Sequence, residues 1–280
     1  MALGSTRLLR IVSTVAASLI LAFAATTESQ VLRRDVYSKH LEHSKIGTNP
    51  MRKIAIYLPP GYQTGKGRYP VIYFLPDTSD GYSFPFDRTN GQNLFDSAIA
   101  RGAIAKFVFV SVDMNTPVGN SWSVNSPATG NWEDFFLSDL VPYVDANFRT
   151  LTGQDSRGIA GDRMGGYGAI RFGMRHPEVF GSVYALHPVG VGPGLQTMYS
   201  RPNWDLLTSA KSIDDLKMDG FSMVFAAIFQ AFLPNPENPP LFADLPARKI
   251  GNQLSIDPKL TGRLQHNFFL EGQLLCTLKT

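Results

Sequence analysis

The sequence predicts an α/β fold in which helices cover both faces of a mostly parallel sheet. Short apolar runs alternate with helix-like blocks from Arg52 onward, and this alternation is typical of such a sandwich. The apolar runs carry few polar residues, as expected of strands that are buried on both faces. With 280 residues, 44% of them hydrophobic and 18% charged, the chain is long enough for one sizeable domain.

The predicted strands share a β-branched and aromatic composition. They cover residues 53–62 (KIAIYLPPGY), 69–77 (YPVIYFLPD), 107–114 (FVFVSVDM), 156–161 (SRGIAG) and 181–186 (GSVYAL). The segment 221–240 is apolar and ends in a proline cluster. Nothing after that cluster predicts a strand.

Three helices are expected between these strands. Residues 93–102 end in a glycine where a C-cap belongs. The second helix begins at Asn131, which can cap it, and Pro142 should kink it. Its buried face is marked by apolar residues at i, i+4 spacing, namely Trp132, Phe136, Leu140, Val144 and Phe148. The third helix follows Gly165 and ends before Pro177.

The N-terminus has the pattern of a signal peptide spanning residues 1–25. Arg7 and Arg10 precede an apolar run over residues 11–25, which contains an A-x-A cleavage pattern at 22–24. A membrane anchor is the alternative, but these 15 residues are fewer than the roughly 20 that span a bilayer. We therefore expect a secreted or periplasmic protein without a stable membrane anchor.

Charge and cysteine content narrow the classes of partner. The formal net charge of +3 falls by two, to +1, when residues 1–25 are removed. A nearly neutral chain offers no electrostatic basis for binding nucleic acid. The single cysteine, Cys276, allows no internal disulfide, so burial of a core must hold the fold together.

The most informative motif lies between the strand 156–161 and the following helix. Residues 161–165 read Gly-Asp-Arg-Met-Gly, which is the glycine frame of G-x-S-x-G with arginine in place of serine. That frame forms the nucleophile elbow, a sharp strand-to-helix turn that exposes one side chain at its apex. Arg163 occupies that apex.

Several stretches together resemble a known family. YLPPGY, YPVIYFLPD, VSVDMNTP, SVNSPATGNWEDF and GIAGDRMGGYGAIRFGMRHPEVFGSVYALHP occur in this order between Arg52 and Pro188. They are similar to the secreted esterase family of the α/β-hydrolase fold, the esterase-D-like group that includes feruloyl esterases and is related to mycolyltransferases. The resemblance implies hydrolysis of a carboxylic ester through an acyl-serine intermediate, without a cofactor.

The resemblance also implies roles for individual positions. The nucleophile would stand at position 163, and the backbone N–H of Met164 would donate to the oxyanion. A second N–H would come from the loop around Asp77 or Thr78. In the family that loop begins with His-Gly, whereas this chain has Pro76 and Asp77. Because an arginine stays protonated, Arg163 cannot replace the serine.

The remaining triad members are not identifiable. The family order is nucleophile, acid, then histidine, and the downstream histidines are His176, His187 and His266. We expect His176 to be a surface residue of the elbow helix, and His187 follows its strand too closely to come after an acid. His266 is a weak candidate base. The resemblance implies two further strands after Leu278, so we expect the chain to lack its last part.

Other motifs have simpler explanations. The glycines at 165, 166 and 168 match no phosphate-binding pattern, and close helix packing explains them. His40 and His43 have no third ligand at suitable spacing, so no metal site is predicted. Trp122, in a polar loop, is a candidate substrate contact. Residues 207–250 are a candidate cap segment, and their apolar stretch 221–233 could instead be a plain core helix.

These observations predict an α/β-hydrolase-like domain over residues 31–280 that belongs to the serine esterases but is catalytically dead or strongly impaired. One alternative is a non-catalytic protein that binds a small ester or a glycan in the old pocket. Another is a non-functional, truncated gene product. In the family fold the strand 181–186 has further neighbours, so here we expect it to form a sheet edge that favours self-association.

Overall fold

The structure, a computed structural model, describes residues 28–191 and 199–269. The predicted signal peptide, Cys276 and Leu278 lie outside the described residues. None of the helices in the described ranges combines the length and the apolarity that crossing a membrane requires.

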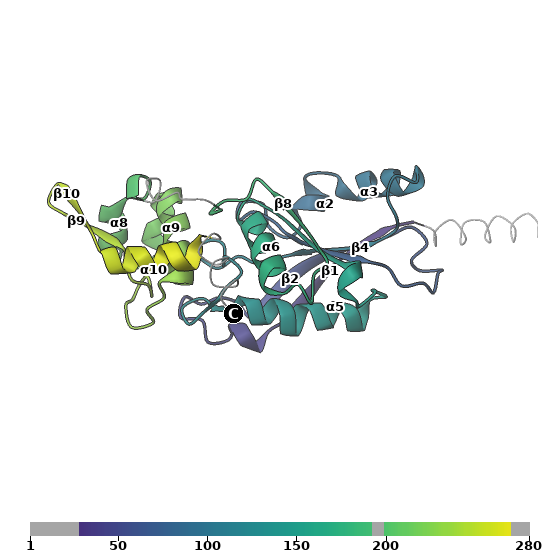
Figure 1. Cartoon of the computed structure of the whole chain (residues 1–280), viewed down its shortest axis with the longest axis horizontal. Helices are drawn as coiled ribbons and strands as arrows, with labels where there is room; N and C mark the ends of the chain where they lie inside the picture. The colour runs from purple at the N-terminus through teal and green to yellow at the C-terminus, as the bar shows by residue number, and fades with distance from the viewer. Residues whose placement is uncertain (1–27, 192–198, 270–280) are drawn as a thin grey trace, which may run out of the picture.

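A six-stranded sheet forms the centre of the molecule, with the strand order β1-β2-β4-β3-β7-β8 (Figure 1). Its strands are β1 (Gln30–Tyr37), β2 (Met51–Leu58), β3 (Val71–Leu75), β4 (Val108–Val112), β7 (Arg157–Asp162) and β8 (Ser182–Leu186). From β4 to β8 the strands run parallel, whereas β1 and β2 are antiparallel to their neighbours. The predicted fold class, an α/β-hydrolase-type sheet with helices on both faces, is confirmed.

Helices cover the two faces of the sheet unequally. On one face, α2 (Phe84–Asp87) and α3 (Gly91–Ala100) pack on aromatic residues of β2, β3 and β4. On the other face lie α6 (Met164–Arg175) and a continuous helical run made of α4 (Trp132–Asp134), the π-helix η2 (Phe135–Leu140) and α5 (Val141–Asn147). Gly102 adopts a positive φ of 69° just past α3, as a C-terminal glycine should.

The helical run 132–147 differs from its prediction in its N-cap, and a π-helical turn lies next to the proline where a kink was expected. The side chain of Asn131 makes no capping hydrogen bond; instead Asn125 accepts one from the backbone N–H of Asp134 at 3.1 Å. The chain stays helical through Pro142, and the N–H of Val141 donates to the carbonyl of Phe136, five residues back. The π-helical turn before Pro142 therefore accommodates the missing N–H of the proline.

Short elements connect the main ones. They are the 3-10 turns η1 (Lys39–Leu41), η3 (Gln154–Ser156) and η4 (Ile213–Met218), and the small hairpin of β5 (Asn125–Ser126) and β6 (Gly130–Asn131). β1 was not predicted, because its three adjacent charged residues, 33–35, interrupt the apolar pattern.

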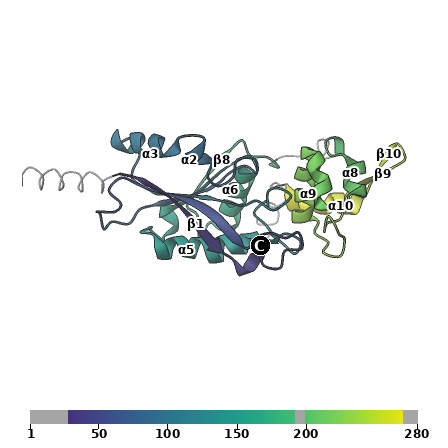
Figure 2. The same cartoon turned by 180° about the vertical axis from the view of Figure 1, so that it is seen from behind.

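Residues 199–269 form a C-terminal helical unit beyond one end of the sheet (Figures 1 and 2). It contains α8 (Trp204–Ser209), α9 (Gly220–Phe232), α10 (Pro258–Phe268) and the hairpin of β9 (Ala247–Ile250) and β10 (Gln253–Ile256). The expectation that no strand follows the proline cluster is therefore wrong. Gly251 and Asn252 separate the paired residues Ile250 and Gln253, and such a two-residue loop is a hairpin signal.

The unit has its own apolar core, which also joins it to the sheet domain. Trp122 from the loop after β4 and Tyr167 from α6 pack in the same buried cluster as Phe229 and Phe268. The hydroxyl of Tyr167 donates to the carbonyl oxygen of Phe268 at 2.7 Å. Burial of aromatic residues thus fixes the helical unit against the N-terminal half of α6.

Candidate functional site

The glycine frame forms a sharp turn between β7 and α6, with Arg163 at its apex. Arg163 adopts φ 50° and ψ −108°, a conformation that costs a non-glycine residue energy and persists only where the surroundings impose it. A Cβ at position 161 would overlap the carbonyl group of Gly165, and one at position 165 would overlap the carbonyl oxygen of Leu75. The frame glycines are therefore required by close backbone packing, and the elbow forms with arginine at its apex.

The apex side chain forms an ion pair with the loop after β3. Leu75 and Gly161 are partners in the parallel β3–β7 register, so Asp77 and Arg163 each stand two residues beyond a paired position. Nη1 of Arg163 lies 3.1 Å from Oδ2 of Asp77, with the arginine side chain 55% exposed and the aspartate 7% exposed. The hydroxyl of Ser79 also donates to Oδ2 of Asp77 at 2.8 Å.

The surrounding charges hold the guanidinium in its protonated form. The hydrogen bond that Arg163 donates to Asp77, followed by the charges of Asp77 and Asp162, raises the pKa of Arg163 above its ordinary value. Burial, and then the charge of Asp77, raises the pKa of Asp80 in the same loop. A protonated guanidinium has donors but no lone pair to attack a carbonyl, so the apex cannot act as nucleophile or base.

The two residues expected to serve the oxyanion lie together. Met164 is the first residue of α6, and the hydroxyl of Thr78 contacts its sulfur at 3.3 Å. The Asn115 side chain donates to the carbonyl oxygen of Thr78 at 3.1 Å and fixes that loop. Their role as N–H donors to an oxyanion stays a prediction.

The downstream histidines occupy three different environments. Nδ1 of His187 lies 3.2 Å from Oδ1 of Asp162, with its imidazole 82% exposed. This acid–histidine pair flanks the apex, and we missed it because the acid precedes position 163 instead of following it. His266 lies on the exposed side of α10.

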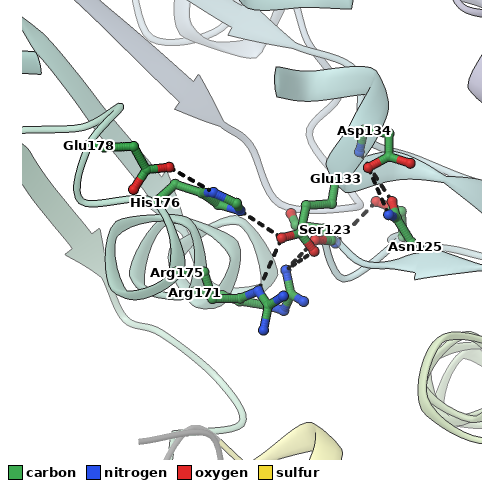
Figure 3. A network of polar contacts seen from close by, with 9 residues as sticks. Ser123, Asn125, Glu133, Asp134, Arg171, Arg175, His176 and Glu178 are labelled. Atoms are coloured by element: carbon green, nitrogen blue, oxygen red, sulfur yellow. Dashed lines mark hydrogen bonds and ion pairs between the residues drawn. The ribbon is translucent and has the colours of Figure 1, made fainter. Parts of the chain in front are cut away.

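His176 is not the simple surface residue that was expected. It is mostly buried, and its Nε2 lies 2.6 Å from Oε1 of Glu133 while its Nδ1 lies 3.2 Å from Glu178 (Figure 3). The carboxylate of Glu133 also forms ion pairs with the guanidinium groups of Arg171, at 2.9 Å, and of Arg175, at 3.0 Å. The end of α6 is thus held to α4 by one carboxylate shared among three basic groups.

The balance of forces on Glu133 favours its ionised form. Burial alone would raise its pKa, but the charge of Arg171 and the hydrogen bonds from His176 and Arg175 outweigh that effect and lower the pKa from 4.5 to about 2. The side chains of Glu133 and Arg171 are 9% and 8% exposed, so water screens their attraction only weakly.

The same cluster supports the loop that carries Trp122. Nη1 of Arg171 donates to the carbonyl oxygen of Ser123 at 2.9 Å. In this loop Trp122 and Ser123 both adopt a φ of 56°. The Trp122 ring packs edge-on against Tyr167 and Phe268. It is 2% exposed, so the expectation of an accessible substrate contact is corrected: Trp122 is a core residue between the sheet domain and the helical unit.

A metal centre has no support in the described ranges, where no three His, Cys, Asp or Glu side chains are placed to hold an ion. The site consists instead of an elbow with a cationic apex, an anionic partner in the loop after β3, and the adjacent residues Thr78 and Met164.

Comparison with known proteins identifies the scaffold. A family model described as putative esterase matches residues 47–212, which is more than half of the chain. The chain belongs to this esterase family. Esterase Rv1288 of Mycobacterium tuberculosis (strain ATCC 25618 / H37Rv) is 31% identical over 144 residues, which cover 50% of this chain and 29% of the relative.

Two further similar proteins carry feruloyl esterase or ferulic acid esterase in their names. The endo-1,4-beta-xylanase/feruloyl esterase of Xylanibacter ruminicola is 30% identical over 158 residues, covering 52% of this chain and 22% of that enzyme. A solved ferulic acid esterase superposes with a TM-score of 0.54 at 26% identity, covering 60% of this chain and 63% of that one. The chain thus spans less than two thirds of the length of each of these relatives.

Proposed function

We propose that this member of the esterase family has lost all, or nearly all, acyl-serine hydrolysis. The ion pair between Arg163 and Asp77 carries this proposal. Both residues depart from the family pattern, one at the nucleophile position and one at the His-Gly loop, and the two departures compensate each other electrostatically. An arginine that had replaced serine without a partner would have left its charge unpaired beside the sheet.

The chemical consequence follows from the step that is lost. Without a hydroxyl at the apex no acyl-enzyme forms, and a water molecule would have to attack the ester directly. Removing the nucleophile from a serine hydrolase leaves a residual acceleration of about 10³–10⁴ over water when the oxyanion hole and binding survive. Trace turnover of an activated ester, without burst kinetics, is the most that this site can supply.

An activated aryl ester such as p-nitrophenyl acetate tests the proposal. We expect the purified chain to release p-nitrophenol no faster than a heat-denatured sample, and a fluorophosphonate probe to leave it unlabelled. Labelling by the probe together with turnover that the probe abolishes would contradict the proposal, because both require an activated serine.

A second candidate function is binding of an ester or a glycan ester without turnover. It is supported by the exposed half of Arg163, whose side chain is 55% exposed: its hydrogen bond to Asp77 uses only Nη1, and a guanidinium has further N–H groups that can donate to a ligand carbonyl. The names of the feruloyl esterase relatives suggest an aromatic acid ester as the ligand.

Calorimetric titration with methyl ferulate separates this candidate from a chain that binds nothing. We expect Arg163→Met to weaken binding about fivefold, the equivalent of one hydrogen bond worth about 1 kcal/mol. Arg34→Met, which removes an exposed arginine from β1, should leave affinity unchanged. Absence of binding, or equal loss in both variants, would rule out a ligand site at Arg163.

We further propose that residues 207–250 act as a cap over the elbow. In support, a Cβ at Gly119 would lie 3.5 Å from Cβ of Ala227 in α9 and 3.9 Å from Cγ2 of Thr78. The α9 helix therefore lies beside the oxyanion loop. Ala227 is 2% exposed, so Ala227→Met should lower the unfolding temperature by overpacking this contact and should also weaken methyl ferulate binding by the variant that remains folded. Unchanged binding would speak against a cap.

We also propose that residues 1–25 direct secretion, on the sequence pattern of two arginines, an apolar run and A-x-A. A fusion of these residues to a reporter that is active only after export tests this directly. Replacing the apolar run by serines should retain the reporter in the cytoplasm, and export by that variant would contradict the proposal.

A further inference from the structure

The C-terminal helical unit contains a pocket of its own, with a volume of about 690 Å³. It is bordered by α8, the loop 238–246, the β9–β10 hairpin and the start of α10. Figure 1 shows the hairpin at the end of the unit farthest from the sheet. The described lining residues all lie between positions 207 and 260, so the pocket is separate from the elbow. Its volume falls within the range of about 300–1,000 Å³ that is usual for small-molecule sites.

Four leucines give the pocket an apolar wall. Leu207, on α8, and Leu241 are buried, at 2% and 5% exposure. Leu245 and Leu260, the latter on α10, are partly buried and pack against the same core cluster. All four line the pocket, so it offers aliphatic surface on which the apolar groups of a ligand can pack.

Three polar residues line the pocket from one face of the β9–β10 hairpin. Arg248 and Ser255 are partners in the antiparallel register, so their side chains lie on the same face. Asp257 follows Ser255 by two residues, and its N–H continues the pairing by donating to the carbonyl oxygen of Pro246 at 2.9 Å. Because side chains alternate between the faces of a strand, Asp257 shares the face of Arg248. All three line the pocket.

The opposite charges of Arg248 and Asp257 do not form an ion pair with each other. Oδ1 of Asp257 accepts hydrogen bonds from the backbone N–H groups of Lys259, at 2.9 Å, and Leu260, at 3.0 Å. The carboxylate is therefore held at the start of α10 as its N-cap. Within the part of the chain that the structure describes, Arg248 forms no ion pair. Its guanidinium is thus available to bind a carboxylate that a ligand brings.

A second carboxylate, that of Asp244, also lines the pocket. Its Oδ1 accepts a hydrogen bond from Nδ2 of Asn235 at 2.6 Å. Among the described residues, hydrogen bonds reach only Oδ1 of Asp244 and of Asp257, so both Oδ2 atoms remain as acceptors for a ligand. Two carboxylates disfavour a ligand that is only anionic, and Arg248 disfavours one that is only cationic. The lining therefore complements a zwitterion with an apolar body.

The spacing of the charges indicates the length of that zwitterion. Arg248 and Asp257 are diagonal neighbours across the hairpin, and such positions lie about 7–8 Å apart. In a single amino acid, one Cα atom separates the ammonium group from the carboxylate. Two residues of an extended chain span about 7 Å. A dipeptide therefore matches the separation of these charges.

We propose that this pocket binds a dipeptide with free ends and aliphatic side chains. The carboxylate of the dipeptide pairs with the guanidinium of Arg248, where two parallel hydrogen bonds can form. The ammonium group donates to the free oxygens of Asp244 and Asp257. The aliphatic side chains pack on the four leucines. This inference does not depend on the proposed function of the elbow.

Calorimetric titration of the full chain with L-leucyl-L-leucine tests the proposal. We expect saturable binding that Arg248→Met and Asp257→Asn each weaken about tenfold or more, because each removes a charge-assisted contact. Asparagine caps a helix as well as aspartate does, so Asp257→Asn should leave α10 intact. N-acetyl-L-leucyl-L-leucine amide has the same side chains but no charged ends, and it should bind at least about tenfold more weakly than the free dipeptide.

Two matched controls separate the pocket from general effects of charge. Arg263→Met removes an exposed arginine of α10 that lies outside the pocket. Asp219→Asn changes the N-cap of α9, whose side chain accepts from the N–H of Ser222 at 3.0 Å. Both should bind the dipeptide like the unmodified chain. Absence of binding, equal binding of the uncharged peptide, or equal losses in the pocket and control variants would overturn the proposal.

Discussion

The elbow helix α6 has an ionic cluster at each end, and the two clusters are built from the same chemistry in different surroundings. At its N-terminal end, Arg163 pairs with Asp77 and keeps half of its side chain in water. Toward its C-terminal end, Arg171 and Glu133 are both nearly buried and bonded to further groups. One cluster occupies the apex of the elbow, and the other holds the helix to α4.

Burial decides what each ion pair contributes. An exposed pair is screened by water and is worth about 0–1 kcal/mol. Removing one partner from a buried pair leaves an uncompensated charge in a medium of low dielectric and costs about 3–5 kcal/mol. Three arginines on this one helix, Arg163, Arg171 and Arg175, differ in exposure and allow the comparison to be made with the same substitution.

The largest effect is expected for Arg171→Met. It leaves Glu133 buried and removes the donor to Ser123, so the free energy of unfolding should fall by about 3–5 kcal/mol. Urea denaturation followed by circular dichroism measures this. Arg175→Met is the control, because its half-exposed side chain contacts the same carboxylate and should cost about 1 kcal/mol. Equal losses in the two variants would show that burial does not set the difference.

The buried cluster should also make stability depend on pH. The folded-state pKa of Glu133 is lowered from 4.5 to about 2, so its contribution is fully present above 4.5 and is lost as the pH falls toward 2. Unfolding in urea at a series of pH values across this window should show wild-type stability falling more steeply than that of Glu133→Gln. If the free energies of unfolding of the two proteins changed with pH in parallel, ionisation of the Glu133 carboxylate would contribute nothing to the stability of the fold.

A smaller effect is expected at the elbow. Arg163→Met removes a half-exposed charge and leaves Asp77, which is 7% exposed, with the hydroxyl of Ser79 as a remaining donor, so the loss should be about 1–3 kcal/mol. The strained backbone is unchanged, because methionine is no more tolerant of a positive φ than arginine. A loss as large as that of Arg171→Met would show that Asp77 behaves as a fully buried charge, and the contrast between the clusters would fail.

The sequence predicted the apolar strands of the sheet well, including the mostly exposed edge strand β8, and the charged or very short strands poorly. The runs that became β3, β4, β7 and β8 are apolar on both faces, and that signal is strong. β1 lies at a sheet edge and mixes apolar with charged residues. Most of its side chains are not buried, so its sequence carries a weaker apolar signal. The hairpin of β9 and β10 was missed because its strands are short, although the Gly251-Asn252 loop was readable.

The candidate site was predicted in its local part only. The elbow and its apex follow from five adjacent residues, so position 163 was identified directly. The partner Asp77 is 86 residues away in sequence, and only the β3–β7 register brings it to the apex. The burial of Trp122 depends in the same way on α10, and that of His176 on α4. Both segments are distant in sequence, so no local sequence pattern predicts these contacts.

The smallest effect is expected on the chemical reactivity of the elbow apex. Arg163→Ser restores a hydroxyl to the apex, yet we expect no burst of product from an activated aryl ester. The acid–histidine pair of His187 and Asp162 flanks the apex, but its imidazole is 82% exposed, so water competes for it and little of its surface is packed to hold it against the new hydroxyl. The measurement is stopped-flow release of p-nitrophenol, with Arg163→Ser/His187→Ala as the control. A burst in the single variant that disappears in the double variant would show that His187 reaches the apex, and the site would then need only its serine to work.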